Sequence, residues 1–105
     1  PGLDGIYVGP ADLSNALGCT PKFDQDEKPV REAIDYIARK TREHGLIAGI
    51  HNGTPKYALQ MIEAGYRFVT IASDARLMAA KAQEVVGEMR SGLKQKASAP
   101  ASGTY

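Results

Sequence analysis

The sequence predicts an α/β domain in which three parallel β-strands alternate with helices. Three short runs rich in apolar and β-branched residues are bounded by glycine or polar residues: Leu3 to Val8, Leu46 to Ile50 and Phe68 to Ala72. Continuous apolar runs of this kind are typical of strands in a parallel sheet that is covered on both faces. Segments with helical periodicity separate the runs, and this βαβ order predicts right-handed crossovers.

The first strand leads directly into the run Gly9-Pro10-Ala11-Asp12-Leu13-Ser14. Residues 13–17 predict a short helical turn that Gly18 closes, so Asp12 is expected where a strand ends and a helical turn begins. In parallel α/β proteins, ligands and metals collect at such strand ends. Spacing alone nevertheless favours a plainer role for Asp12, as the N-cap of the turn.

The second helix is predicted between Pro29, which suits a first helical turn, and Gly45, which suits a left-handed residue after a helix. Asp35 and Arg39 are four residues apart, in the favourable order for a helical ion pair. The apolar stripe of this helix recurs at steps of three and four and consists of Val30, Ala33, Ile34, Ile37, Ala38 and Thr41.

The third helix is expected to follow Thr54, a suitable N-cap that precedes Pro55, and to end at Gly65. Its predicted buried side consists of Ala58, Met61 and Ile62. The last helix is expected to begin near Ser73 or Asp74, whose side chains suit a cap. One face of that helix is a predicted packing surface, formed by Met78, Ala82, Val85 and Met89.

Composition limits the function classes. The 105 residues suffice for one small domain, and no apolar run is long enough to span a membrane. Acidic residues outnumber basic ones before Arg90, which argues against nucleic-acid binding. Cys19 is the only cysteine, so no internal disulfide can form, and a reducing cytoplasm fits best. Because Pro1-Gly2 leads straight into a strand, we expect a piece of a longer chain.

The run DGIYVGPADLS, from Asp4 to Ser14, resembles the signature of the HpcH/HpaI aldolase family, metal-dependent pyruvate aldolases with a (β/α)₈ barrel. The resemblance continues through residues 45–50 and 64–71 and includes Ser73-Asp74. It implies that residues 1–92 are the C-terminal part of such a TIM barrel, about strands 6–8 with their helices, because a full barrel needs about 250 residues. Residues 93–105 are rich in Lys, Ser, Ala, Pro and Gly, a composition that predicts a disordered tail.

The resemblance also implies site roles. Asp12 would be a carboxylate ligand of a divalent cation such as Mg²⁺ or Mn²⁺, which bind hard oxygen ligands. The backbone of Gly9, Pro10 and Ala11 would shape the substrate site, where N–H groups at a helix start favour the pyruvate carboxylate. His51, where the family usually has an apolar residue, would line the aldehyde pocket; an exposed loop histidine is an equally open reading. The family's metal-binding Glu and its catalytic His and Arg are expected outside this chain.

The implied activity is that of a carbon–carbon lyase that cleaves 4-hydroxy-2-oxo acids to pyruvate and an aldehyde. We expect a homo-oligomer, since these aldolases commonly exchange their last helix, and negligible activity from this chain alone. Neither nucleic acid nor a membrane is an expected partner. Two alternatives stay open: a structural or oligomerisation fragment without activity of its own, and a related acyl-CoA lyase. The Gly-Pro-Ala-Asp form and the lack of a basic cluster for phosphate favour the free oxo-acid aldolases.

Overall fold

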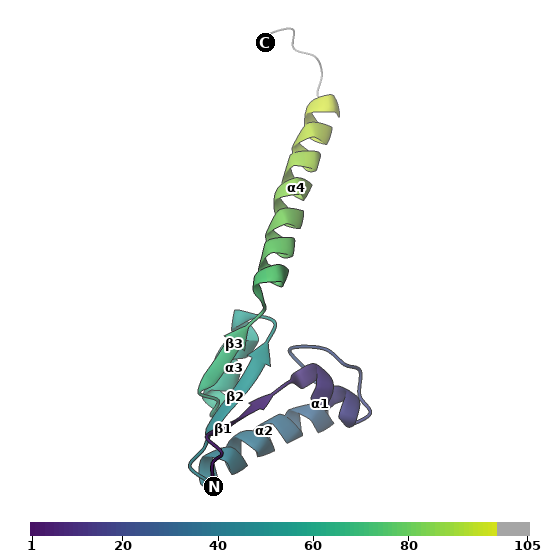
Figure 1. Ribbon diagram of the computed structural model, residues 1–105. Helices are drawn as coiled ribbons and strands as arrows, with labels where there is room; N and C mark the ends of the chain where they lie inside the picture. The colour runs from purple at the N-terminus through teal and green to yellow at the C-terminus, as the bar shows by residue number, and fades with distance from the viewer. Residues whose placement is uncertain (99–105) are drawn as a thin grey trace. The chain divides into compact units, whose positions relative to one another are not determined.

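The computed structural model describes residues 1–98. Its elements follow one another as β1 (Gly5–Val8), α1 (Pro10–Ala16), α2 (Lys28–Glu43), β2 (Ile47–Asn52), α3 (Pro55–Ala64), β3 (Phe68–Ile71) and α4 (Asp74–Ser98), as Figure 1 shows. Residues 1–72 form one compact unit, and a second unit begins at Ser73. The predicted α/β alternation is therefore confirmed, with strand boundaries that differ from the predicted ones by one or two residues.

All three strands run parallel in the order β1-β2-β3. The register places Val8 opposite Ile50, and Ile50 opposite Val69. It also places His51 opposite Thr70. Because parallel strands present their carboxyl ends at one edge, the segments that follow β1 and β2 emerge at the same edge of the sheet.

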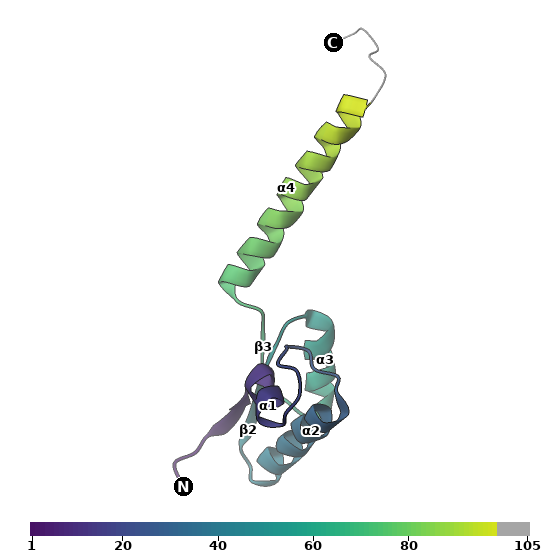
Figure 2. The ribbon, with the colours of Figure 1, turned by 90° about the vertical axis from the view of Figure 1, so that its right-hand side faces the viewer.

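The helices α2 and α3 cover only one face of the sheet, as Figure 2 shows. On that face the core consists of Val8, Val30, Ile34, Ala38, Ala48, Ile50, Tyr57, Met61 and Tyr66. The other face, which we call the open face, leaves Tyr7 51%, Ile47 55% and Phe68 58% exposed. The expectation of a sheet covered on both faces is thus wrong for residues 1–72. In a closed barrel, side chains from the other strands fill this inner face.

The predicted apolar stripe of α2 is largely buried: Val30, Ile34, Ala38 and Thr41 are its buried members. The predicted Asp35–Arg39 ion pair is wrong. Asp35 instead accepts from Arg31 Nε at 3.3 Å, and Arg39 lies 3.8 Å from Glu43. Asp35 has a basic residue four positions away on either side, so helical spacing alone could not decide between them.

Helix α3 begins and ends as the sequence predicts. The Thr54 hydroxyl accepts from the Tyr57 N–H at 3.3 Å, and Gly65 ends the helix at φ +113°. This left-handed conformation favours glycine, and a Cβ there would also displace the end of the Arg42 side chain, whose Nη1 would lie 2.7 Å away. One predicted core residue is wrong: Ile62 is 51% exposed, and Tyr57 is buried in its place.

Tyr66 connects the core to the alkaline stability of the fold. It is fully buried, and its hydroxyl donates to the Ile34 carbonyl at 2.6 Å. Burial, followed by the nearby Asp35 carboxylate, raises the pKa of Tyr66 well above its ordinary value. A raised folded-state pKa gives stability that is complete below the unfolded pKa, about 10, and is lost as pH rises toward the folded value.

We therefore expect the free energy of unfolding to fall above about pH 10, with Tyr66 contributing part of the fall. In Tyr66→Phe, stability at pH 7 should drop by about 1 kcal/mol and the alkaline fall should be shallower. Tyr36→Phe, at a residue 53% exposed, is the control. Urea unfolding at pH 8 and near pH 10.5 measures both; identical alkaline slopes in wild type and Tyr66→Phe would contradict the assignment.

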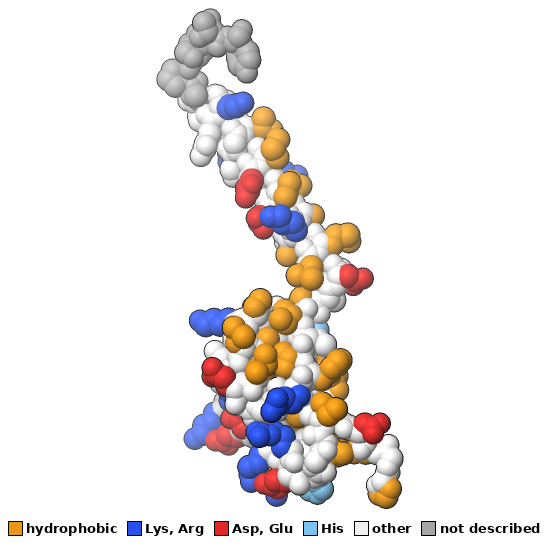
Figure 3. All heavy atoms as spheres, turned by 90° about the vertical axis from the view of Figure 1, so that its left-hand side faces the viewer, with side chains coloured by type: hydrophobic (Ala, Val, Ile, Leu, Met, Phe, Trp, Pro, Cys, Tyr) orange, Lys and Arg blue, Asp and Glu red, His pale blue; other side chains and the backbone are white. Residues whose placement is uncertain are grey.

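Helix α4 presents only exposed side chains in the described part of the second unit. Ser73 Oγ accepts from the Arg76 N–H at 3.2 Å, which agrees with the predicted cap. The predicted packing surface, the apolar stripe of α4 (Met78, Ala82, Val85 and Met89), lies on this exposed helix, along which Figure 3 shows hydrophobic side chains.

Helix α4 extends without a break to Ser98. The expectation of a disordered tail is therefore wrong for residues 93–98, which are helical. The rest of that predicted tail, 99–105, lies outside the described residues. None of the helices within residues 1–98 combines the length and apolar character needed to cross a membrane.

Candidate metal and substrate site

Asp12 lies in the first turn of α1, directly after β1. The helix begins at Pro10, with Gly9 as an extended N-cap, and the Leu13 N–H donates to the Gly9 carbonyl at 2.9 Å. Proline suits a first helical position because it has no N–H to leave unpaired. The expected helical turn over 13–17 therefore starts three residues early, and the reading of Asp12 as its N-cap is wrong.

The Asp12 carboxylate is exposed and lies close to the backbone of Gly9. A Cβ on Gly9 would be 3.3 Å from Asp12 Oδ2, so the glycine leaves room for this carboxylate. Within residues 1–98, Asp12 makes neither an ion pair nor a side-chain hydrogen bond. Its oxygen lone pairs are consequently available for a ligand at the carboxyl edge of the sheet.

The donor set of this chain fits one part of a divalent cation site. Over the described residues, no group of three or more His, Cys, Asp or Glu side chains could hold a metal ion. Mg²⁺ characteristically takes one or two protein carboxylates and completes its shell with water and substrate oxygens. Asp12 therefore fits as a single carboxylate ligand, with the further ligands coming from elsewhere.

A buried hydrogen-bond network holds α1 in place. Ser14 Oγ donates to the Pro10 carbonyl at 2.5 Å, and Gln25 Nε2 donates to Ser14 Oγ at 2.9 Å. Gln25 Nε2 also donates to the Thr20 carbonyl at 2.8 Å. Gln25 and Ser14 are both fully buried. The helical turn that bears Asp12 is thus tied to the loop that follows it, and the Ser14 hydroxyl has a structural role.

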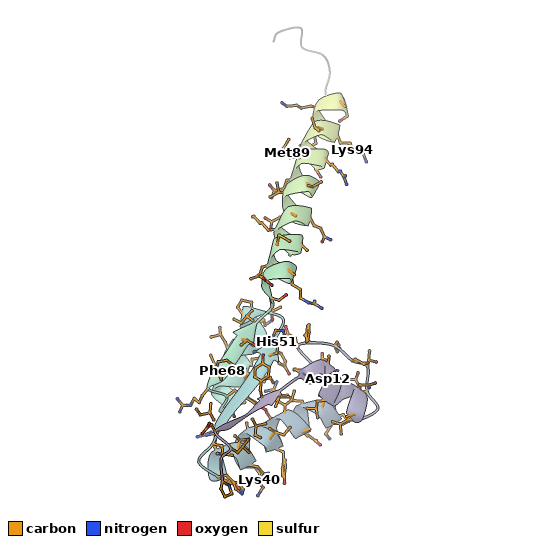
Figure 4. The ribbon with its side chains drawn as sticks, in the orientation of Figure 1. Asp12, Lys40, His51, Phe68, Met89 and Lys94 are labelled. Carbon is orange, nitrogen blue, oxygen red and sulfur yellow. The ribbon has the colours of Figure 1, made fainter. Side chains whose placement is uncertain are left out.

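His51 stands at the carboxyl end of β2 and is half-buried. Its Nδ1 lies 2.9 Å from Thr70 Oγ1, which in turn lies 2.5 Å from the Tyr7 hydroxyl. The Phe23 ring meets the imidazole edge-on at 4.9 Å. Figure 4 shows Asp12 and His51 at the same end of the sheet, opposite the end where Lys40 lies. The structure therefore brings these two predicted site residues to one edge.

Sequence reasoning missed Tyr7, Thr70 and Phe23. Alternation along each strand predicts which residues share a face, but the register between strands decides that Tyr7 and Thr70 meet, and the sequence does not show the register.

Sequence reasoning also missed Asp24, whose carboxylate accepts from the Gly53 N–H at 2.7 Å and the Thr54 hydroxyl at 2.6 Å. Asp24 therefore fixes the turn that follows His51. Its φ of +50° is a conformation that Asp tolerates better than most residues.

A cavity of about 270 Å³ lies on the open face, nearer the amino ends of the strands than Asp12. Its lining is almost entirely apolar: Asp4, Gly5, Ile6, Tyr7, Ile47, Gly49 and Phe68. This position and lining match the packed interior of a barrel, so we assign the cavity to packing.

The other side chains that could react or bind a ligand, Cys19, His44 and Asp74, make contacts that indicate structural roles. The neighbouring Glu27 carboxylate, with partial burial, raises the pKa of the Cys19 thiol, which keeps it protonated and poorly nucleophilic. His44 Nδ1 contacts the Lys40 carbonyl at 2.9 Å, at the carboxyl end of α2 as expected for a helix-end partner. Asp74 is the first residue of α4, and its Oδ1 accepts from the Ala75 N–H at 2.8 Å, so the cap is Ser73 rather than Asp74.

Comparison with known proteins supports one family. A hydroxypyruvate/pyruvate aldolase of Rhizorhabdus wittichii is 34% identical over 89 residues, which are 85% of this chain and 36% of that protein. The 2-dehydro-3,6-dideoxy-6-sulfogluconate aldolase of Pseudomonas putida is 33% identical over 88 residues, 82% of this chain and 33% of that protein. No family model matches the chain.

A solved structure agrees with the sequence matches. An HpcH/HpaI aldolase/citrate lyase family protein from Burkholderia cenocepacia shares the fold at a TM-score of 0.79 and 31% identity, over 86% of this chain and 34% of that one. The chain spans about a third of the length of each of these relatives. Sequence and fold together show that this chain belongs to the HpcH/HpaI aldolase family and forms part of its TIM barrel.

Proposed function

We propose that this chain supplies one metal ligand and part of the substrate pocket of a metal-dependent pyruvate aldolase. The reaction is cleavage of a 4-hydroxy-2-oxo acid to pyruvate and an aldehyde, or the reverse addition. The relatives support an aldolase, since they are named as a hydroxypyruvate/pyruvate aldolase and a 2-dehydro-3,6-dideoxy-6-sulfogluconate aldolase. The observation that carries the proposal is the unpaired Asp12 carboxylate, which lies beside Gly9 at the carboxyl edge of the sheet.

Asp12 would hold the divalent cation together with ligands outside this chain. When bound, such a cation supplies Lewis-acid chemistry: it stabilises the negative charge that develops on the keto oxygen as the C–C bond breaks. The first-turn N–H groups of Ala11 and Asp12 would orient the pyruvate carboxylate, because helix N-terminal N–H groups attract anions. Pro10 has no N–H and would contribute shape only. His51 would line the aldehyde side of the pocket.

A specific observation favours a second, structural role for the last helix. The apolar stripe of α4 is exposed over its whole length in the described residues. Contiguous apolar side chains exposed along a helix characteristically mark an interface. We infer that the stripe packs in a homo-oligomer, which is compatible with the aldolase proposal and would also remain if that proposal failed. A cytoplasmic location stays a prediction.

The test is pyruvate release from a 4-hydroxy-2-oxo acid by the assembled barrel, meaning this chain together with the remaining strands. With Mn²⁺ or Mg²⁺ we expect steady turnover that EDTA abolishes and added metal restores. This chain by itself should give no turnover above background, since it has one ligand and none of the family's catalytic His or Arg. Absence of metal-dependent turnover in the assembled barrel would contradict the aldolase proposal and leave the assembly role.

A further inference from the structure

Three polar side chains from three different strands form a continuous hydrogen-bonded chain on the open face. Thr70 Oγ1 lies between the Tyr7 hydroxyl, at 2.5 Å, and His51 Nδ1, at 2.9 Å. We call Tyr7, Thr70 and His51 the polar relay. It joins β1 to β3 across β2, so its geometry depends on the register of the whole sheet.

Gly49 gives the Tyr7 ring of the polar relay room beside β2. It lies opposite Tyr7 on β2, and a Cβ there would be 3.0 Å from Tyr7 Cδ1 and 3.1 Å from the Phe68 carbonyl. Contacts this tight would push the Tyr7 ring and the Phe68 backbone apart by a few tenths of an ångström. With glycine, the ring lies against the backbone of β2 and reaches Thr70.

The polar relay leaves one nitrogen of His51 uncommitted. Nδ1 is engaged by Thr70, and the Phe23 ring packs edge-on against the imidazole at 4.9 Å, so the ring orientation is held from two sides. In the described part of the chain, His51 Nε2 makes no hydrogen bond. A half-buried imidazole with one fixed nitrogen and one available nitrogen is arranged to bind a polar group.

The chemistry of that polar group follows from the proton count. The Thr70 hydroxyl carries one proton and can donate it either to His51 or to Tyr7. If it donates to Nδ1, Nε2 carries the ring proton and donates; if Nδ1 donates to Thr70, Nε2 accepts. A hydroxyl group can both donate and accept, so it matches His51 in either tautomer. A carbonyl, which only accepts, matches one tautomer.

The position of His51 relative to Asp12 indicates which part of a substrate it would meet. Val8 pairs with Ile50, so His51 is one residue beyond that pair on β2, as Gly9 is on β1. Figure 4 shows Asp12 and His51 at this same edge. A substrate whose oxo-acid end is held at Asp12 would therefore extend its other end along the edge toward β2.

We propose that His51 binds, through Nε2, a hydroxyl group on the aldehyde portion of the substrate, so that the enzyme prefers hydroxylated aldehydes to alkyl aldehydes. Thr70 and Tyr7 are positioning residues that set the orientation of the His51 ring. This inference rests on the proposed aldolase function and adds the substrate class and the residue that selects it.

The experiment compares two aldehydes of nearly equal size in addition to pyruvate, catalysed by the assembled barrel with Mn²⁺. Glycolaldehyde carries a hydroxyl where propionaldehyde carries a methyl group. In His51→Phe, which keeps a ring, the ratio of kcat/KM for glycolaldehyde to that for propionaldehyde should fall about tenfold, the effect of one lost hydrogen bond. His44→Phe, at the opposite end of the sheet, is the matched control and should leave the ratio unchanged.

A second variant tests the positioning role. Thr70→Val keeps the side-chain shape and removes the hydroxyl, so KM for glycolaldehyde should rise severalfold while kcat/KM for propionaldehyde stays constant. In the same variant the balance between the two His51 tautomers should change, and the ¹⁵N chemical shifts of the ring nitrogens measure that balance. A merely structural role for Thr70 would alter both aldehydes alike.

The outcomes separate the two levels of the proposal. If wild type adds neither aldehyde to pyruvate in the presence of Mn²⁺, the proposed aldolase function is overturned, and this inference with it. If wild type is active and His51→Phe leaves the ratio unchanged, or lowers both reactions equally, the inference about His51 is overturned while the aldolase proposal stands.

Discussion

Replacing Asp12 with Asn should lower kcat/KM for metal-dependent pyruvate formation by at least about a thousandfold, or about 4 kcal/mol of transition-state stabilisation. Asparagine keeps the size of the side chain and one oxygen but loses the negative charge that a hard cation requires. The fold should be unaffected, because Asp12 is exposed and makes no side-chain contact that holds α1 in the described residues.

The matched control for this prediction is Asp4→Asn, which removes a carboxylate just before the opposite end of β1. Its activity should stay within about twofold of wild type, since surface charges this far from the site are screened by salt. Steady-state pyruvate release by the assembled barrel, with saturating Mn²⁺, measures both variants. Activity of Asp12→Asn within about threefold of wild type would exclude Asp12 as a metal ligand.

Truncating Ile34 to Ala should destabilise the fold by about 2–5 kcal/mol, the range for deleting a buried aliphatic side chain. Ile34 is fully buried at the centre of α2, and its carbonyl accepts the hydroxyl of Tyr66. The loss therefore falls on the packing between α2, the sheet and the segment that follows α3. So large a loss is a substantial fraction of the total stability of an ordinary domain.

The same substitution at Ile62 is the matched control, because Ile62 is 51% exposed on α3. Ile62→Ala should cost about 1 kcal/mol or less, the smaller loss expected where half of the side chain already contacts water. Urea unfolding followed by far-UV circular dichroism measures both variants, and the chain has no tryptophan to serve as a fluorescent probe. Equal losses at Ile34 and Ile62 would contradict the assignment of the core.

Local patterns in the sequence predict most of the fold. Continuous apolar runs identify the three strands, Thr54 marks the start of α3, and Gly45 and Gly65 mark the ends of α2 and α3 where the structure has them. These signals succeed because capping and left-handed backbone conformations depend on a few adjacent residues. The parallel order of the strands follows from the helical crossovers between them.

The predictions that were wrong concern ion pairs, buried residues and helix starts, which residues adjacent in sequence do not determine. Asp35 has basic partners on either side in sequence, and the structure pairs it with Arg31. Ile62 lies next to the buried Met61 on α3, and only the angle at which α3 packs on the sheet decides which of the two is covered. The early start of α1 depended on Pro10, whose fixed φ suits a first helical position.

Some residues of the candidate site could likewise be predicted from the sequence, and others could not. Asp12 and His51 could be selected from the sequence because each follows a predicted strand, and the shared edge then follows from parallel pairing. Thr70 and Tyr7 could not, because the hydrogen bonds from Thr70 to His51 and to Tyr7 depend on the exact register of the three strands. Residues that act through other residues leave no local pattern in a single sequence.

The most direct test of the central proposal is Mn²⁺ binding measured by electron paramagnetic resonance. The six-line signal of free Mn²⁺ is recorded while the assembled barrel is titrated, in the presence of pyruvate, for wild type, Asp12→Asn and Asp4→Asn. We predict that wild type and Asp4→Asn remove free Mn²⁺ with the same affinity, and that Asp12→Asn binds at least about tenfold more weakly. Equal Mn²⁺ affinity in wild type and Asp12→Asn would contradict the assignment of Asp12 as a ligand of the metal.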